Sequence, residues 1–206
     1  MFEKVISNKA KQNLAILNKA SILKNFYLAA GTGLALQIGH RVSLDLDFFT
    51  KKEFRPEILV AQFKKIGNFS LKSKDFGTLH GIFNQTRITF LYYPYSLIFP
   101  TKKILKIDVA DWRDIACMKL DAVSSRGSKK DFVDLYFICQ KIKLNNLLKI
   151  FKRKYQSVDY NLIHILKSLI YFEDAEKEPM PKMLKQVSWS EIKTFFTKEV
   201  KRIIKI

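Results

Sequence analysis

The chain has 206 residues, of which 48% are hydrophobic and 27% charged, and this balance favours a folded domain with a real core over a disordered chain. Its 37 Lys and Arg residues against 19 Asp and Glu residues give a net charge of +18, which favours an acidic partner such as nucleic acid, although solvated surface lysines would give the same total. No apolar run approaches the roughly 18 residues that span a bilayer, so we expect no membrane partner.

The compartment is predicted from two further features. The start of the chain, MFEKVISNKAKQN, is charged and polar where a signal peptide would be apolar. Cys117 and Cys139 lie in helix-like patterns without metal-type spacing, so we expect buried free thiols in a reducing compartment. Both features favour a cytoplasmic protein.

The first part of the chain alternates helices and strands. Gly39 would end one of these helices, and Thr32 could cap its start. In chain order, hydrophobic periodicity and turn residues predict a helix within 3–24, a short strand at 25–31, a helix at 32–39, a strand at 43–49 and a helix at 55–67.

The middle of the chain predicts a meander of antiparallel strands over 69–98, because Phe, Tyr, Thr and Ile are frequent there and glycines punctuate them. Residues 102–110 add one strand. Helices are predicted for the rest, at 111–125, 128–141, 144–155, 160–175 and 188–206, with EKEPMPK (176–182) as a linker. The fold class is therefore α+β: a small mixed sheet flanked by helices over 1–110, and a helical C-terminal region over 111–206 packed on it.

Two carboxylates interrupt the apolar strand SLDLDFF. Asp45 and Asp47 are i and i+2 and project from one face, whereas Leu44, Leu46 and Phe48 project from the other and can be buried. Adjacent carboxylates repel each other, so a basic side chain or a cation must lie near them. Mg²⁺ is commonly held by one or two carboxylates together with substrate phosphates, which makes this pair a candidate metal site.

The turn Gly31-Thr32-Gly33 precedes this pair at a strand-to-helix junction. Glycine lets the backbone approach a ligand closely, and free N–H groups at a helix start attract anions. A phosphate-binding turn beside a carboxylate pair is the arrangement that phosphoryl or nucleotidyl transfer requires.

Two segments resemble a known family. YLAAGTGLALQIGHRVSLDLDFF (27–49) resembles the first motif of the nucleotidyltransferase-like AbiEii/AbiGii toxin family, and DWRDIACMKLDAVSSRGSKKDFVDLYFI (111–138) resembles its downstream motif. The resemblance implies a DNA-polymerase-β-like nucleotidyltransferase core, the toxin component of a toxin–antitoxin or abortive-infection system, and an antitoxin encoded nearby. It also implies NTP as substrate, Mg²⁺ or Mn²⁺ as cofactor, and RNA, above all the acceptor end of tRNA, as partner.

The same resemblance implies roles for individual residues. Asp45 and Asp47 would bind the metal, and Lys119 and Asp131 would complete the catalytic set. Nucleotide phosphates would be contacted by a group of polar and basic residues, namely Gly31, Thr32, Arg41, Ser43, Lys119, Arg126 and Lys130.

Alternatives stay open for three residues near these motifs. Arg41 could bind a triphosphate, or it could cancel the charge of the aspartates. His40 is expected to be structural, hydrogen-bonded in its loop. Asp134 could support the site, although we favour a buried ion pair with Arg126 that joins two helices.

A third carboxylate is expected on a later strand of such a site, but TRITFLYY (86–93) contains no acidic residue. Either two aspartates suffice, or Asp108 or Asp131 completes the set. Asp131 could equally be a solvated partner of Lys130. The missing acid leaves a non-catalytic nucleotide- or RNA-binding module as the alternative to an enzyme, and a kinase-like use of the site is a further one.

The segment KIFKRKY (149–155) bears on the RNA prediction. Lys152, Arg153 and Lys154 cannot all point into a core, so we expect them to contribute contacts to an RNA backbone.

Overall fold

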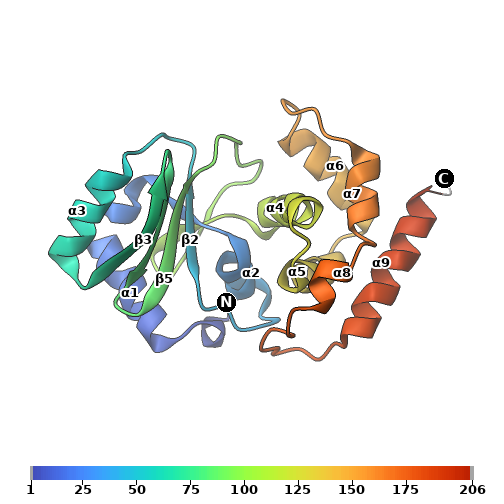
Figure 1. The fold of residues 1–206 in the computed structure, drawn as a ribbon, viewed down its shortest axis with the longest axis horizontal. Helices are drawn as coiled ribbons and strands as arrows, with labels where there is room; N and C mark the ends of the chain where they lie inside the picture. Colours follow the sequence, from blue (N-terminus) through green and yellow to red (C-terminus); the bar gives the residue numbers. More distant parts are fainter. Residues whose placement is uncertain (1, 205–206) are drawn as a thin grey trace.

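The computed structural model describes residues 2–204 and contains a seven-stranded mixed sheet (Figure 1). Its strands, in chain order, are β1 (Tyr27–Leu28), β2 (Leu46–Thr50), β3 (Phe69–Asp75), β4 (Thr78–Phe83), β5 (Thr86–Tyr92), β6 (Lys102–Ile104) and β7 (Ile107–Val109). Their order across the sheet is β3-β4-β5-β2-β1-β7-β6. β2 is central, parallel to β5 and antiparallel to β1, so the predicted aspartate strand lies in the middle of the sheet.

The helices surround this sheet and form the C-terminal half. They are η1 (Glu3–Val5), α1 (Asn8–Lys19), η2 (Ile22–Asn25), α2 (Ala30–Ile38), α3 (Pro56–Ile66), α4 (Trp112–Ser125), α5 (Lys129–Cys139), α6 (Leu144–Lys154), α7 (Leu162–Ser168), α8 (Glu173–Glu176) and α9 (Trp189–Ile204). In Figure 1, α1 and α3 lie on one side of the sheet, and α2, α4 and α5 lie on the other. The α+β prediction is confirmed.

Two hydrophobic cores form, one on each face of the sheet. Beneath α1 and α3, the rings of Phe48, Phe63 and Phe90 pack together, with centroids 4.9 Å apart for Phe48–Phe90 and 5.6 Å for Phe63–Phe90. In the core on the other face, the rings of Phe132 of α5 and Phe196 of α9 pack with their centroids 5.9 Å apart. Because α2 contributes residues to both cores, it links the sheet to the C-terminal helices.

Several predicted elements differ in detail. Residues 102–110 form a hairpin instead of one strand, because Leu105 and Lys106 adopt φ values of 51° and 64° and make a two-residue turn without the usual Asn or Gly. Thr32 does not cap α2. The first helical hydrogen bond runs from Gly33 N–H to the Ala29 carbonyl, so the helix begins two residues earlier. Gly39 ends α2 in the left-handed region, as predicted.

Other predicted helices are shorter or divided. The helix expected within 3–24 splits into η1, α1 and η2, and the one expected at 160–175 splits into α7 and α8 at a turn around Ile170. Of the helix expected at 188–206, residues 205 and 206 lie outside the described residues. Leu44 is 69% exposed, not buried, because β2 begins only at Leu46 and the strand alternation does not reach it.

The predicted linker is packed against the rest of the chain. Val42 N–H donates to the Lys182 carbonyl at 2.8 Å, and Leu184 N–H donates to the His40 carbonyl at 2.9 Å. Arg41 and Met183 form an antiparallel bridge. Residues 178–185, here called the strap, therefore run beside the loop that carries the aspartates.

Cys117 and Cys139 are both free, as predicted, but only Cys117 is fully buried, and Cys139 is partly exposed. Burial raises the pKa of each thiol to about 12, so both are protonated at neutral pH and poorly reactive. Within residues 2–204, no helix has the length and apolar character needed to cross a membrane.

Lys154 is not available to an RNA backbone. Its ammonium is buried and bonds the Asp114 carboxylate at 2.8 Å and the Ser96 carbonyl at 3.0 Å, so it joins α6 to α4. Lys152 and Arg153 are exposed, as expected for residues pointing away from the core.

Replacing Lys154 should therefore destabilise the fold. Lys154→Ala leaves the Asp114 carboxylate buried without its cation, and we expect a loss of about 3–5 kcal/mol in the free energy of unfolding. The control is the exposed residue Lys152, because Lys152→Ala should change the free energy of unfolding by less than about 0.5 kcal/mol. Urea unfolding measures both, and equal effects would contradict the buried pair.

Candidate active site

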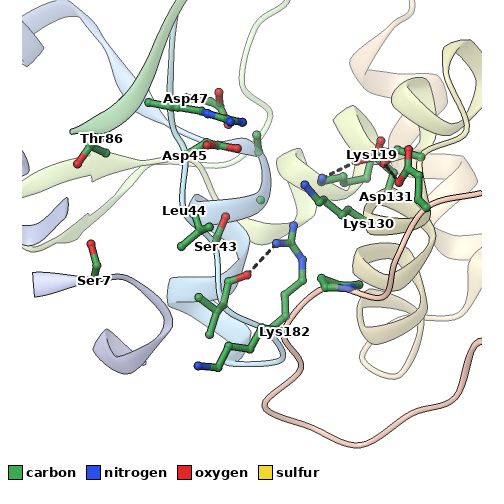
Figure 2. Close-up of a pocket in the computed structure, with 18 of the residues that line it drawn as sticks. Ser7, Ser43, Leu44, Asp45, Asp47, Thr86, Lys119, Lys130, Asp131 and Lys182 are labelled. Atoms are coloured by element: carbon green, nitrogen blue, oxygen red, sulfur yellow. Dashed lines mark hydrogen bonds and ion pairs between the residues drawn. The ribbon is translucent and has the colours of Figure 1, made fainter. Parts of the chain in front are cut away.

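A cleft of about 890 Å³ opens where the sheet meets the C-terminal helices. Figure 2 shows Asp45 and Asp47 near its centre, Ser7 and Thr86 on one side of them, and Lys119, Lys130 and Asp131 on the other. The remaining lining residues are Lys9, Ala30, Gly31, Arg41, Val42, Ser43, Leu44, Gln85, Arg87, Arg126, Ser128, Glu178, Pro181 and Lys182.

The two aspartates of the cleft are not ion-paired within the described chain. Asp47 lies on β2 and Asp45 directly precedes it, and neither forms an ion pair with any side chain of residues 2–204. Burial, and next the charge of Asp45, raise the pKa of Asp47. A bound cation would remove both penalties, so the donor set fits a hard divalent ion that completes its coordination with substrate phosphates.

Thr32 supports the aspartates from behind the cleft wall. Its hydroxyl is hydrogen-bonded to the Ser43 hydroxyl at 2.8 Å and to the backbone carbonyl of Asp45. Thr32 is fully buried and does not line the cleft, whereas Ser43 does. Of these two predicted phosphate-contacting residues, the structure thus brings only Ser43 to the wall.

Gly31 gives room to a neighbouring arginine. A Cβ at this position would lie 2.5 Å from Arg41 Nη2 and 3.2 Å from Ser43 Oγ. The preceding residue, Ala30, adopts a φ of 49°, a left-handed conformation that costs energy for a residue with a side chain. Both residues line the cleft, so the backbone here is strained where it faces the site.

Asp134 is the centre of a buried ion network. Its carboxylate accepts from Arg41 Nε at 2.7 Å and Nη2 at 2.9 Å, lies 2.6 Å from His40 Nε2, and pairs with Lys119 Nζ at 2.6 Å. Although burial alone would raise it, the charges of Lys119 and Arg41 hold the pKa of Asp134 well below its usual range. Asp134 therefore has the structural role that we favoured, as a buried ion-pair partner, but with Arg41 and Lys119. The expected pair of Asp134 with Arg126 is wrong.

Asp131 forms a second, linked pair. It is 1% exposed and bonds Lys119 Nζ at 2.6 Å and Arg126 Nε at 2.9 Å. Lys119 therefore bridges Asp131 and Asp134, and these two charges raise its pKa although burial opposes them. The alternative of a solvated Asp131–Lys130 pair is wrong: Lys130 is exposed on the cleft, without an acidic partner in the described chain.

The candidates for a third carboxylate are also placed. Asp108 pairs with Lys103 Nζ at 2.9 Å and does not line the cleft, so it cannot complete the site. On β5, the residue paired with Asp47 is Thr89, and Asp131 is committed to its cations. Over residues 2–204, no cluster of three or more His, Cys, Asp or Glu side chains could hold a metal ion, so no third side chain of these types joins Asp45 and Asp47 in such a cluster.

Four charged residues of the cleft were not predicted from the sequence: Lys9, Arg87, Glu178 and Lys182. Glu178 accepts from the Ser128 hydroxyl at 2.8 Å and from Lys129 N–H at 3.0 Å, and so holds the strap against the start of α5. Arg87 could have been found as the single charge in an otherwise uncharged strand. The other three carry no local signal, because tertiary packing brings them to the cleft.

The charges of the cleft fall into two groups. Arg41, Lys119 and Arg126 are bound to Asp131 or Asp134. The other basic side chains have no acidic partner among the described residues, and they are Lys9, Arg87, Lys130 and Lys182. Unpaired carboxylates at the centre and unpaired cations around them match a polyphosphate bound through a metal ion.

Comparison with known proteins places the chain in a family. It is 37% identical over 207 residues to the protein aq_aa25 of Aquifex aeolicus (strain VF5), described as uncharacterised, and the match covers 97% of this chain and 98% of that one. The chain belongs to the family of this Aquifex protein. It matches none of the models of known protein families.

Solved structures share its fold. The nucleotidyltransferase toxin MenT4 of Mycobacterium tuberculosis has a TM-score of 0.58 at 13% identity, over 96% of this chain and 85% of that chain. A candidate nucleotidyltransferase of Helicobacter pylori has a TM-score of 0.51 at 18% identity, over 97% and 98%. The antibiotic-resistance factor ANT(2″)-Ia has a TM-score of 0.52 at 10% identity, over 72% and 91%. The present chain thus has the nucleotidyltransferase fold.

Removing the Asp134 carboxylate should destabilise the site and the fold together. Asp134→Ala leaves Arg41 and Lys119 short of their shared partner, so the free energy of unfolding should fall by about 3–5 kcal/mol. Asp108→Ala, which removes an exposed carboxylate paired with Lys103, should cost less than about 1 kcal/mol. Chemical denaturation compares the two variants, and a small effect at Asp134 would refute its central role.

Proposed function

We propose that the protein is a metal-dependent nucleotidyltransferase that adds a nucleoside monophosphate from an NTP to an RNA end, with tRNA as the favoured acceptor. The observation that carries this proposal is the unpaired Asp45–Asp47 pair at the centre of a cleft ringed by unpaired cations, on a nucleotidyltransferase fold. We further propose that it acts as the toxin of a toxin–antitoxin or abortive-infection system. The motif resemblance to the AbiEii/AbiGii family and the fold shared with the MenT4 toxin support this role.

Asp45 and Asp47 would hold Mg²⁺ or Mn²⁺ through carboxylate oxygens, the ligands that hard cations prefer. Such an ion supplies charge stabilisation to the phosphate oxygens as the transferred phosphoryl group changes partners. The protein's own contribution is to keep both carboxylates in place, through Thr32 behind Asp45 and through the parallel pairing of Asp47 with Thr89.

The reaction is an in-line displacement at the α-phosphorus. The acceptor hydroxyl oxygen forms a bond to that phosphorus, the bond to the α–β bridging oxygen breaks, and pyrophosphate leaves with the electron pair while the hydroxyl proton passes to solvent. Arg126 and Lys130, from the wall of the C-terminal helices, and Ser43, beside Asp45, would bind the NTP phosphates. Lys119, kept charged by Asp131 and Asp134, adds a fixed positive field there.

The charge of the cleft favours an anionic acceptor. A crystal structure shows ANT(2″)-Ia in complex with adenylyl-2″-tobramycin. In the present chain, the unpaired cations of the cleft would repel a cationic acceptor and attract a phosphate backbone. A nucleic-acid end is therefore the acceptor class we propose.

The aspartates supply the first test of this function. Wild-type protein incubated with total RNA and each NTP labelled at the α-phosphate should label RNA, and Asp45→Asn or Asp47→Asn should abolish labelling, because an amide is a poor ligand for a hard cation. Circular dichroism should show both variants folded. Wild-type turnover in either variant would exclude the metal site.

Labelling at the γ-phosphate separates the alternatives. Label that enters RNA only from the γ-position would identify a kinase-like use of the cleft. Absence of label from both positions, with retained nucleotide binding, would favour a non-catalytic binding module.

Two lysines of the cleft should behave differently when replaced. Lys130 is exposed and unpaired, so Lys130→Ala should raise the KM for NTP roughly tenfold, by loss of one charge-assisted contact, with an unchanged melting temperature. Lys119→Ala should lower the melting temperature as well, because Asp131 and Asp134 lose a shared cation. Thermal melts and steady-state kinetics distinguish them. Matching profiles for both variants would show that Lys130 is also structural.

A further inference from the structure

The wall of the cleft opposite Lys130 carries two cations that the phosphate contacts described above do not use. Lys9 lies in the first turn of α1 and Arg87 on β5, and both are exposed to the cleft. Figure 2 shows Ser7, two residues before Lys9, and Thr86, the residue before Arg87, on the side of the aspartates away from Lys119 and Lys130. The metal-binding pair therefore lies between two basic walls.

This second wall is built rigidly. Asn13 of α1 is buried, and its side-chain amide donates to the Phe83 carbonyl at 3.0 Å and to the Thr86 hydroxyl at 2.7 Å. The contact clamps α1 onto the turn between β4 and β5. Lys9 lies one helical turn before Asn13, and Arg87 lies next to Thr86. This contact therefore fixes the backbone positions of Lys9 and Arg87 relative to each other.

Neither Lys9 nor Arg87 stabilises the element on which it lies. A lysine in the first turn of a helix opposes the helix dipole, and α1 has no acidic residue there. Arg87 pairs across the strands with Ile82 and has no carboxylate partner among residues 2–204. Residues that break a local rule without an internal compensation point to a ligand.

Register places Arg87 beside the reacting centre. β2 and β5 are parallel, with Asp47 paired to Thr89. Arg87 precedes Thr89 by two residues, as Asp45 precedes Asp47, so Arg87 shares the face of Thr89 at the end of the strand next to Asp45. Strand β5, on which a third carboxylate was expected, therefore carries a cation at its end next to Asp45.

The geometry of in-line transfer requires the two substrates to approach the α-phosphorus from opposite sides. The attacking oxygen approaches the α-phosphorus from the side opposite the leaving pyrophosphate. With the NTP phosphates on the wall of Lys130 and Arg126, the acceptor must lie against Lys9 and Arg87. We propose that Lys9 and Arg87 form the subsite for the backbone phosphates next to the acceptor hydroxyl of a nucleic-acid strand, an inference that rests on the proposed transferase function.

The first experiment measures binding alone. Unfractionated tRNA is titrated against the protein without NTP at several salt concentrations. Lys9→Ala/Arg87→Ala should make the slope of log affinity against log salt shallower by about 1.4–1.8, because two phosphate contacts are lost. Lys64→Ala/Lys65→Ala removes the same charge from exposed residues of α3 outside the cleft and should leave the slope unchanged. Equal slopes in the two double variants would overturn the subsite.

The second experiment measures transfer with the same proteins. Lys9→Ala/Arg87→Ala should raise the KM for tRNA at least tenfold and leave the KM for NTP unchanged, the reverse of Lys130→Ala. A raised KM for NTP with an unchanged KM for tRNA would overturn the assignment and put the triphosphate on this wall. If the wild type transfers no label but the expected difference in slope is found, the transferase function fails while the RNA subsite stands.

Discussion

The buried carboxylate of Asp134 is the interaction on which the site depends. A carboxylate removed from water is costly unless cations and donors surround it, and here Arg41, His40 and Lys119 do so from the loop before β2 and from α4. Because Asp134 lies on α5, one side chain joins three segments that are distant in the sequence. The wall of the cleft is consequently fixed by the same contacts that hold the C-terminal helices to the sheet.

The ion network around Asp134 accounts for some charged residues of the cleft and leaves others without a partner. Arg41 and Lys119 form their ion pairs with Asp134 and Asp131, and neither forms one with Asp45 or Asp47. Burial, and next the charge of Asp45, therefore still raise the pKa of Asp47, although the charge of Lys119 opposes them. The strap strengthens the arrangement, because Glu178 holds it to α5 and its backbone pairs with the loop that contains Arg41.

A second buried ion pair fixes helix α4 at its first turn. Lys154 of α6 bonds Asp114 in the first turn of α4, while Lys119 lies farther along α4 and bonds α5. Helix α4 is thus anchored by buried ion pairs in its first turn and again near its middle. Under the proposed function, such anchoring would keep the cations of this wall within reach of the phosphates, because a displaced wall would lose charge-assisted contacts.

Local patterns in the sequence determined the α+β class, the aspartate strand, the end of α2 at Gly39 and the free thiols, because periodicity, glycine conformation and residue type act within a few residues. The partners of the charged residues were decided only by tertiary structure. The sequence pattern could not show that Asp134 meets Arg41 instead of Arg126, that Lys154 is buried, or that the strap and Lys9 reach the cleft. Each of these depends on which distant segments pack together, and a buried charge takes whichever partner that packing brings within hydrogen-bonding distance.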